Sequence, residues 1–366
     1  MKILHVAEAF EGGIIEIMRL LSIHLPEFEH VIVHGNRKIH LDSIKATFPE
    51  NVHFIKWHSA KREISISGDL KAYRELIKIF RKNLPFDALH LYSSKAGILG
   101  RIAGKSLGIK NILYSPQGAS FERQDISGFK RKIYGFIEKG ASKLPGQIVA
   151  ASKSEQKSFE NLGIPAICIN NGVSIDLNFH KQFPENEFTI VNAARISEQK
   201  NPALFNSIAE AFKDNPLVKF VWVGDGPLKN ELTSPNIQIT GWVGKAEVER
   251  NMKQAHLYLS TALWEGLPLS VLEAMKFNLP LLLSRCVGNV DLVEENVNGY
   301  CFTAKEEAIQ CINHYLDDKN LMHEHGACSY NKIKQDFSID QMKNKFKALY
   351  ISDINIDASP LLFHVS

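Results

Sequence analysis

The stretch from Ser260 to Phe302 constrains the fold more than any other part of the chain, because it reads as a loop, a short helix and a buried strand in immediate succession. Gly266 gives the loop backbone freedom, and Pro268 suits a helix start, where its missing N–H has no partner. Good helix formers follow, and Pro280 ends the helix early. The run from Leu279 to Ser284 is short and apolar, as a buried parallel strand should be.

Two glutamates, Glu265 and Glu273, flank this helix start. The free backbone N–H groups of a helix start, here near residues 269–272, attract anions together with the helix dipole. A diphosphate bound there would leave one carboxylate on each side to accept hydrogen bonds from sugar hydroxyls. The spacing therefore indicates a nucleotide-sugar site, although the two glutamates alone also fit ordinary exposed carboxylates.

The same stretch resembles the donor-site signature of glycosyltransferase family 4, whose members are retaining enzymes of the GT-B fold. That signature runs E-G-x-P-x-x-x-x-E-A-M, then G-x-P, a strand and Ser, paired glycines, an acidic residue and N-G. Three positions depart from it, because Asn278 and Val287 replace glycines and Asp291 replaces a glutamate. The matching residues are Glu265, Gly266, Pro268, Glu273, Ala274, Met275, Pro280, Ser284, Gly288, Asn298 and Gly299.

The resemblance implies roles for these residues. Glu265 is expected to hold sugar hydroxyls and to stabilise oxocarbenium character at the reacting carbon, whereas Glu273 is expected to bind the ribose. The expected donor-binding residues of this stretch are Leu267, Pro268, Leu269, Ser270, Val271, Leu272 and Glu273.

Short β-type runs alternate with helical stretches along both halves of the chain, which predicts parallel sheets covered on both faces. With the resemblance, we expect an α/β protein of the GT-B fold: two Rossmann-like, doubly wound parallel-sheet domains that face a cleft. The acceptor-side domain is expected at residues 1–170 and the donor domain at 171–336. A helix at about 337–350 is expected to pack back onto the first domain, and residues 351–366 form a tail.

A glycine-rich turn follows the first predicted strand and precedes a helical pattern from Ile15 to His24. The dinucleotide fingerprint G-x-G-x-x-G is absent from this turn, which argues against a dehydrogenase. In family 4 the equivalent loop closes over the donor phosphates and sugar. Gly13 is therefore expected to contact the donor.

Two cations, Arg195 and Lys200, follow a predicted strand in the second half of the chain. The family pattern G-R-x-x-x-x-K-N matches here, with Ala194 in place of Gly. Arg offers a planar fork for phosphate oxygens and Lys a point charge. Both are expected to stabilise the leaving diphosphate without a divalent metal. A further family loop, ending here at Val243, is expected to contact the nucleotide base through its backbone.

Gln117 marks the main departure from the family, because members commonly have a histidine in a T-x-H-G or S-P-H-G segment and this chain has S-P-Q-G. Glutamine donates a hydrogen bond but does not exchange a proton near neutral pH. Retaining transfer with the leaving diphosphate as base needs no protein base. We therefore expect Gln117 to orient the substrate as part of the catalytic group.

Composition indicates an ordinary globular protein, with 45% hydrophobic and 23% charged residues. No stretch approaches the roughly 20 apolar residues of a membrane span, and no signal peptide is evident, so we expect a cytoplasmic protein. The five cysteines are expected to be reduced. Two Cys–His spacings, involving Cys311, His314, His325 and Cys328, fit helix packing better than a metal site. We expect no metal or other cofactor.

The charge distribution favours a membrane or phosphate partner for the first half. Residues 51–150 carry 18 Lys and Arg against 7 Asp and Glu. The segment from Lys130 to Phe136 mixes cations with aromatics, as an interfacial helix does, and it fits a solvated helix with one core face equally well. Peripheral contact with an anionic membrane at the inner face is thus one expectation, and nucleic acid is not an expected partner.

The predicted reaction is retaining transfer of a sugar from a nucleoside diphosphate, UDP favoured over GDP, to a hydroxyl of a saccharide or lipid-linked saccharide acceptor. The resemblance places this reaction in capsule, O-antigen or exopolysaccharide synthesis. Two alternatives remain: a non-catalytic nucleotide-sugar-binding scaffold, which Gln117 favours, and a sugar-nucleotide epimerase of the same fold, which would use more titrating groups.

Overall fold

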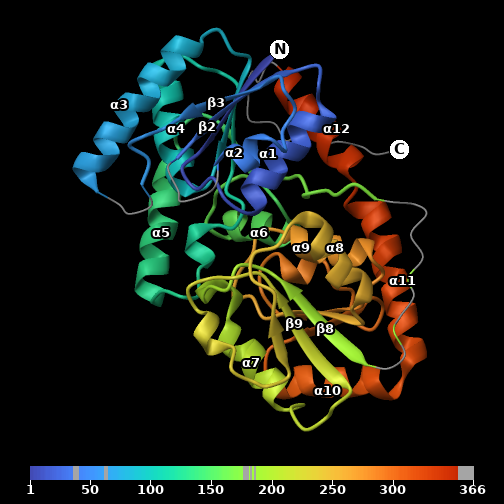
Figure 1. Ribbon diagram of the computed structural model, residues 1–366. Coiled ribbons are helices and arrows are strands. Elements are labelled where there is room, and N and C mark those ends of the chain that lie inside the picture. The colour runs from blue at the N-terminus through green and yellow to red at the C-terminus, as the bar shows by residue number, and fades with distance from the viewer. Residues whose placement is uncertain (36–40, 62–64, 176–180, 182–183, 185–186, 353–366) are drawn as a thin grey trace.

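The computed structural model describes residues 1–352 except 36–40, 62–64, 176–180, 182–183 and 185–186. It contains two parallel β-sheets, each covered by helices on both faces, one built mainly from the first half of the chain and the other from the second (Figure 1). This arrangement confirms the predicted fold class.

The first sheet has the strand order β3-β2-β1-β4-β5-β6-β7, and all its described pairs are parallel. Short apolar runs form the inner strands β1, β2, β4, β5 and β6, which are almost fully buried because helices cover both faces, whereas the edge strands β3 and β7 are only partly buried. Their bounds are β1 Lys2–Ala7, β2 Glu29–His34, β3 Val52–Lys56, β4 Ala88–Tyr92, β5 Ile112–Ser115, β6 Gln147–Ala150 and β7 Ile167–Cys168.

The second sheet has the order β10-β9-β8-β11-β12-β13 and is also parallel. Its strands are β8 Phe188–Ala193, β9 Val218–Val223, β10 Ile237–Ile239, β11 Leu257–Ser260, β12 Leu281–Ser284 and β13 Gly299–Phe302. Strand order reverses between β1 and β4 in the first sheet and between β8 and β11 in the second. Ligands of doubly wound sheets bind outside the carboxyl ends of the strands at such points.

Amphipathic helices cover both sheets, their apolar faces packed on the strands. On and near the first sheet are α1 Gly13–His24, α2 Leu41–Lys45, α3 Ile66–Asn83, α4 Ser94–Ser106, α5 Gly128–Ala141 and α6 Lys153–Asn161. With the second sheet are α7 Pro202–Glu210, α8 Lys245–Gln254, α9 Leu269–Lys276, α10 Lys305–Asp317 and α11 Lys319–Asp336. The described residues also form short 3₁₀ turns at η1 Ser120–Glu122, η2 Glu198–Lys200, η3 Lys229–Glu231 and η4 Asn289–Asp291.

The last described helix, α12 (Ile339–Ile351), lies beside α1 rather than on the second sheet (Figure 1). Its buried side chains Met342, Phe346 and Tyr350 join the core beneath the first sheet. The Tyr350 hydroxyl lies 2.7 Å from Nδ1 of His90 on β4. The chain therefore crosses between the two sheets twice, once near residue 171 and once near residue 338.

Candidate active site

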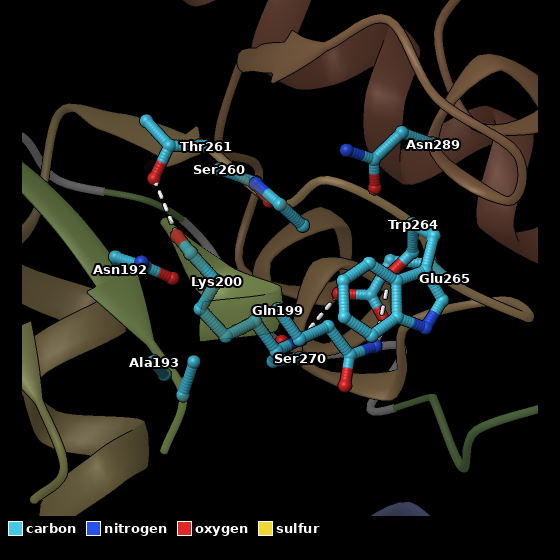
Figure 2. Close-up of polar contacts among 12 residues, drawn as sticks. Asn192, Ala193, Gln199, Lys200, Ser260, Thr261, Trp264, Glu265, Ser270 and Asn289 are labelled. Atoms are coloured by element: carbon cyan, nitrogen blue, oxygen red, sulfur yellow. Dashed lines mark hydrogen bonds and ion pairs between the residues drawn. The ribbon is translucent and has the colours of Figure 1, made fainter. Parts of the chain in front are cut away.

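An ion pair between Lys200 and Glu265 lies at the carboxyl end of the second sheet (Figure 2). Lys200 ends the η2 turn after β8, and Glu265 lies in the loop between β11 and α9. The Lys200 ammonium contacts Oε1, while the Gln199 amide donates to Oε2 at 3.3 Å and to the Trp264 carbonyl at 2.8 Å. Both side chains are shielded, with 18% of Lys200 and 8% of Glu265 exposed. Lys200 and Glu265, which belong to motifs 65 positions apart in the sequence, thus form one ion pair in the structure.

The loop that carries Lys200 is fixed through its backbone. The Thr261 hydroxyl donates to the carbonyl of Lys200 at 2.7 Å, as Figure 2 shows, and to that of Asn201 at 3.1 Å. Asn201 has a left-handed φ of 48°, and its side chain accepts from the Leu204 N–H to cap α7, with Pro202 in the first helical turn. Lys200 is therefore presented from a loop tied to both β11 and α7.

The start of α9 faces the first domain. Pro268 is the N-cap rather than the first helical residue, and its carbonyl accepts from both Val271 and Leu272 N–H. Among the described residues, the N–H groups of Leu269 and Ser270 then have no hydrogen-bond partner. Of the four N–H groups predicted to bind an anion, those of Leu269 and Ser270 are thus free, whereas those of Val271 and Leu272 donate to the Pro268 carbonyl.

Gly13 lies directly opposite this helix start. A Cβ built on Gly13, the first residue of α1, would lie 3.7 Å from Leu269 Cδ1. The preceding residue, Gly12, has a φ of 54°, a conformation that L side chains rarely adopt. Two helix starts, one from each domain, therefore lie face to face, and each has its positive dipole end at the interface.

Gln117 lies at the contact between the two domains. Its amide exchanges two hydrogen bonds with the buried Asn171 amide, at 3.0 and 3.2 Å, and Asn171 donates at 2.9 Å to the Leu267 carbonyl. A Cβ on Gly266 would lie 2.7 Å from the Gly118 nitrogen, so only glycine fits there. The Gln117 loop thus rests on the backbone that follows Glu265.

Glu273 lines a cavity of about 270 Å³ between the domains. The first domain contributes Glu16 and Arg19 from α1, and the second contributes Lys245 and Lys276. Burial raises the pKa of Glu273; Lys245 opposes this shift and Glu16 reinforces it. A carboxylate held among cations in a partly open cavity can accept hydrogen bonds from ligand hydroxyls.

Arg195 lies at the edge of the site and does not contact Lys200. It follows β8 and is 49% exposed, and its Nη1 is 3.2 Å from Oε2 of Glu11, which precedes the Gly12–Gly13 turn of the other domain. Val243, the predicted base-contacting residue, lies after β10 and packs against the core cluster that contains Leu267 and Val271. The described contacts link neither Arg195 nor Val243 directly to Glu265.

A second link between the domains was missed at the sequence level. The Ser154 hydroxyl and N–H, at the start of α6, both donate to the Asp291 carboxylate, and the Gly288 N–H donates to the Ser154 hydroxyl at 2.8 Å. A Cβ on Gly288 would lie 2.7 Å from the Gly266 carbonyl oxygen, so this close approach requires glycine. The acidic residue of the family signature thus serves here as an acceptor for the first domain.

Next to Ser154, the Glu155 carboxylate holds the Gln117 loop. It is fully buried and accepts from the N–H groups of Gly118 and Ala151, both at 2.7 Å. Burial raises its pKa to about 7, and these backbone donors only partly oppose the shift. The S-x-x-E spacing of Ser152 and Glu155 is the capping-box signature, which could have revealed the helix start but not its contact with Gly118.

Other features lie outside this site. A larger hollow of about 790 Å³ beside the start of α3 contains none of the predicted site residues. Within the described ranges, no group of three or more His, Cys, Asp and Glu side chains is arranged to hold a metal ion. His325, one of the Cys–His residues, bonds Tyr315 at 2.7 Å where α11 packs on α10. Among the described residues, no helix is long and apolar enough to cross a membrane.

The geometry defines a two-domain transferase site of the GT-B type, and comparison with known proteins identifies its family. Residues 174–333 match the family model described as glycosyl transferases group 1. A UDP-Gal:alpha-D-GlcNAc-diphosphoundecaprenol alpha-1,3-galactosyltransferase of Escherichia coli is 30% identical over 319 residues, which cover 79% of this chain and 81% of the relative. The chain belongs to the group 1 glycosyltransferases and is an enzyme of that class.

Two further similarities extend over most of the chain. The capsular polysaccharide biosynthesis glycosyltransferase CapM of Staphylococcus aureus is 22% identical, over 79% of this chain and 83% of CapM. The crystal structure of Anabaena HepE in complex with UDP and glucose superposes with a TM-score of 0.76 at 16% identity, covering 95% of this chain and 98% of HepE. At that identity the superposition establishes the fold alone.

Proposed function

We propose that this glycosyltransferase moves a sugar from a UDP-sugar to a hydroxyl of a lipid-linked saccharide, with retention at the anomeric carbon, in the synthesis of a cell-surface polysaccharide. The observation that carries the proposal is the arrangement around the start of α9. Glu265, the free amides of Leu269 and Ser270, and the Glu273 carboxylate follow one another along one short segment, and Lys200 from the turn after β8 pairs with Glu265.

The diphosphate of the donor would lie between the facing starts of α1 and α9. Lys200 and Arg195 would neutralise the charge that develops on the departing diphosphate, together with the two free amides. Each cation now has a carboxylate partner, Glu265 and Glu11 respectively, so an incoming diphosphate would replace or share these partners. Cationic side chains and helix-start amides perform this role without a divalent metal.

Glu273 would accept hydrogen bonds from the ribose hydroxyls in its cavity, and the backbone near Val243 would contact the base. Glu265 would bind hydroxyls of the transferred sugar and stabilise positive charge at the anomeric carbon. In the transfer step, the bond from the anomeric carbon to the diphosphate oxygen breaks, and the acceptor oxygen bonds to the same face. The acceptor proton passes to the leaving diphosphate, so no protein base is needed.

Gln117 fits this scheme as a positioning residue. Its side-chain amide is engaged by Asn171, which also holds the Leu267 carbonyl. It therefore fixes the loop after Glu265 from the opposite domain, whereas a titrating histidine would add a proton that the proposed step does not use.

The donor and acceptor classes are supported by relatives. The Escherichia coli relative is named for UDP-Gal and for a GlcNAc carried on diphosphoundecaprenol, and HepE is described with UDP and glucose. Other relatives are named for O-antigen and capsule synthesis. We therefore favour uridine over guanosine and a saccharide diphospholipid as acceptor.

A thermal-shift screen tests the donor site first. With EDTA present, UDP and UDP-sugars should raise the melting temperature, whereas GDP should not, because we expect the site to bind uridine. A ligand at a hundredfold excess over its Kd stabilises the fold by about 2.7 kcal/mol. Glu273→Ala should weaken the UDP shift. Glu249→Ala removes a carboxylate that contacts Lys276 but does not line the cavity, and it should leave the shift unchanged.

Product analysis then tests the reaction. Incubation with the preferred UDP-sugar and a saccharide diphospholipid should yield a product whose new linkage has the anomeric configuration of the donor, as read by NMR. An inverted linkage would refute the retaining mechanism, and the absence of any shift with uridine or guanosine nucleotides would refute the donor site.

A further inference from the structure

Helix α5 has its apolar face turned toward solvent. Phe129 is 74% exposed, Phe136 72%, Ile137 41% and Ile133 40%. Their spacing of i, i+4, i+7 and i+8 places them on one side of the helix, which is the pattern of a core-facing stripe. Here the described chain leaves the two phenylalanines largely uncovered and the two isoleucines only partly covered, so α5 departs from the ordinary arrangement of a surface helix.

The opposite side of α5 anchors the helix to the first domain. Gly135 lies against Leu162, with 3.6 Å from a built Cβ to the leucine methyl carbons. The buried Glu138 accepts from the Tyr114 hydroxyl at 3.0 Å and lies 3.7 Å from the buried Arg101 guanidinium. Small and polar residues on this side therefore hold the helix in place, while Phe129 and Phe136 remain largely exposed on the other side.

Cations border the stripe. At 3.6 residues per turn, Lys130 lies on one flank of the four apolar side chains, and Lys132 and Lys139 lie on the other. All three are exposed. The one acidic residue between positions 128 and 143, Glu138, is buried on the far side. The outward surface of α5 is thus apolar at its centre and positive at its edges, which is complementary to an anionic lipid interface.

The segment that precedes α5 in the sequence contacts the candidate active site. The segment that leads into α5 carries Arg123, whose guanidinium lies 5.8 Å from the ring centroid of Trp264, next to Glu265. The Arg123 guanidinium makes a bidentate hydrogen-bonded ion pair with the Asp125 carboxylate. In Figure 1, α5 lies at the outer edge of the first domain, at the height of α6.

We infer that this surface, Phe129, Ile133, Phe136 and Ile137 with Lys130, Lys132 and Lys139, docks the enzyme on an anionic membrane. The apolar side chains enter the interface between headgroups and acyl chains, and the cations contact lipid phosphates. Docking sets the cleft beside Trp264 close to the bilayer, where the saccharide of a lipid-linked acceptor is presented. That last consequence rests on the proposed function, whereas the docking itself does not.

Vesicle sedimentation tests the inference. Wild-type protein should sediment with vesicles that contain phosphatidylglycerol and much less with pure phosphatidylcholine. The double variants Phe129→Ser/Phe136→Ser and Lys130→Glu/Lys132→Glu should each bind anionic vesicles at least about tenfold more weakly. None of these four exposed side chains is part of the donor site, so thermal stabilisation by UDP should persist in both variants.

Matched controls lie on the second domain. Leu217→Ser removes a comparably exposed apolar side chain, and Lys305→Glu reverses an exposed charge on α10; both should sediment as wild type does. Unchanged sedimentation of the Phe129→Ser/Phe136→Ser variant, or failure of the wild type to bind anionic vesicles, would overturn the inference. A wild-type dimer that this variant converts to a monomer, without vesicle binding, would show instead that the stripe joins two copies of the chain.

If UDP did not raise the melting temperature of the wild type, the proposed donor would be refuted, but the sedimentation result would still stand. The two failures are therefore distinguishable. If the wild type both binds UDP and sediments with anionic vesicles, the α5 variants should lose sugar transfer to an acceptor embedded in vesicles. They should keep transfer to a short-chain acceptor that is free in solution.

Discussion

Lys200 is the residue on which the proposed chemistry depends most directly. Its ammonium is shielded from solvent, its carbonyl is fixed by Thr261, and its partner Glu265 is held a second time by Gln199. A charge prepared in this way needs little reorganisation when a diphosphate arrives, which is the condition under which electrostatic stabilisation contributes most.

Replacement of Lys200 should therefore impair catalysis far more than stability. We expect Lys200→Ala to lower kcat by about 10²- to 10³-fold, in the range for loss of one preorganised charge-stabilising group. Steady-state kinetics with the UDP-sugar provides the measurement. Lys229→Ala, which removes an exposed lysine after β9, should behave as wild type, and equal activity losses in the two variants would contradict the assigned role.

Residue identities in the site could be predicted from sequence far better than their partners. Glu265, Lys200 and Gly13 are expected at the donor site from motifs that resemble those of family 4, and local patterns add only that each lies in a loop or turn next to a strand or a helix start. The ion pair of Lys200 with Glu265 and the amide exchange of Gln117 with Asn171 could not be predicted, since they join segments 65 and 54 positions apart. Such pairs depend on how the two domains dock, which no local pattern encodes.

At the scale of elements, helix α6 connects the domains through its first turn. Ser152 caps it, Ser154 contacts Asp291 of the second domain, and Glu155 holds the Gly118 N–H. The element boundaries predicted from sequence were close to those observed, as for α1 and α12. The sequence did not indicate that the first turn of α6 is an interdomain contact, because its S-x-x-E pattern specifies only the local cap.

Activity should depend on the protonation state of Glu155. Its pKa of about 7 means that the carboxylate loses acceptor capacity for the Gly118 N–H as pH falls below neutrality, so kcat/KM should decrease toward acid pH. Glu155→Gln should flatten that profile and lower activity at pH 8. Glu160→Gln, an exposed site on the same helix, should keep the wild-type profile; a flattened profile there would refute the assignment.

The contribution of Glu155 to stability should change in the opposite direction over the same range. Because the folded-state pKa of Glu155 is raised above its ordinary value of 4.5, the buried carboxylate destabilises the fold as pH rises from about 4.5 to about 7. In urea unfolding, the Glu155→Gln protein should not show this decrease of stability with rising pH. A purely structural role would change stability alone, whereas a positioning role also changes the pH profile of kcat/KM.

At the scale of the whole molecule, α12 fastens the end of the described chain to the first sheet through a buried polar network. His90 contacts the hydroxyls of Tyr350 and Tyr92, and His5 contacts Tyr92 and His30. Burial lowers the pKa of all three histidines, that of His90 to about 3. These rings are therefore neutral in the folded protein at neutral pH.

The contribution of these histidines to the free energy of unfolding should fall as the solution is acidified. The unfolded chain binds protons at these histidines below pH 6.5, while folded His90 does so only near pH 3, so stability is full above 6.5 and declines between the two values. His90, whose folded pKa is about 3, contributes a slope of about 1.4 kcal/mol per pH unit between these values. In urea unfolding between pH 6.5 and 5, His90→Gln should lower the slope of the unfolding free energy against pH by about this amount relative to wild type, whereas His53→Gln, at an exposed site, should leave the slope unchanged.

The return of α12 to the first sheet also bears on how the protein is made. Domains generally fold as units during synthesis, the first-made domain before the next. Here the core beneath the first sheet lacks Met342, Phe346 and Tyr350 until the ribosome has released residues 339–351, which come after the whole second domain. The second domain can therefore complete its core before the first, so that in this enzyme the order of maturation runs against the order of translation.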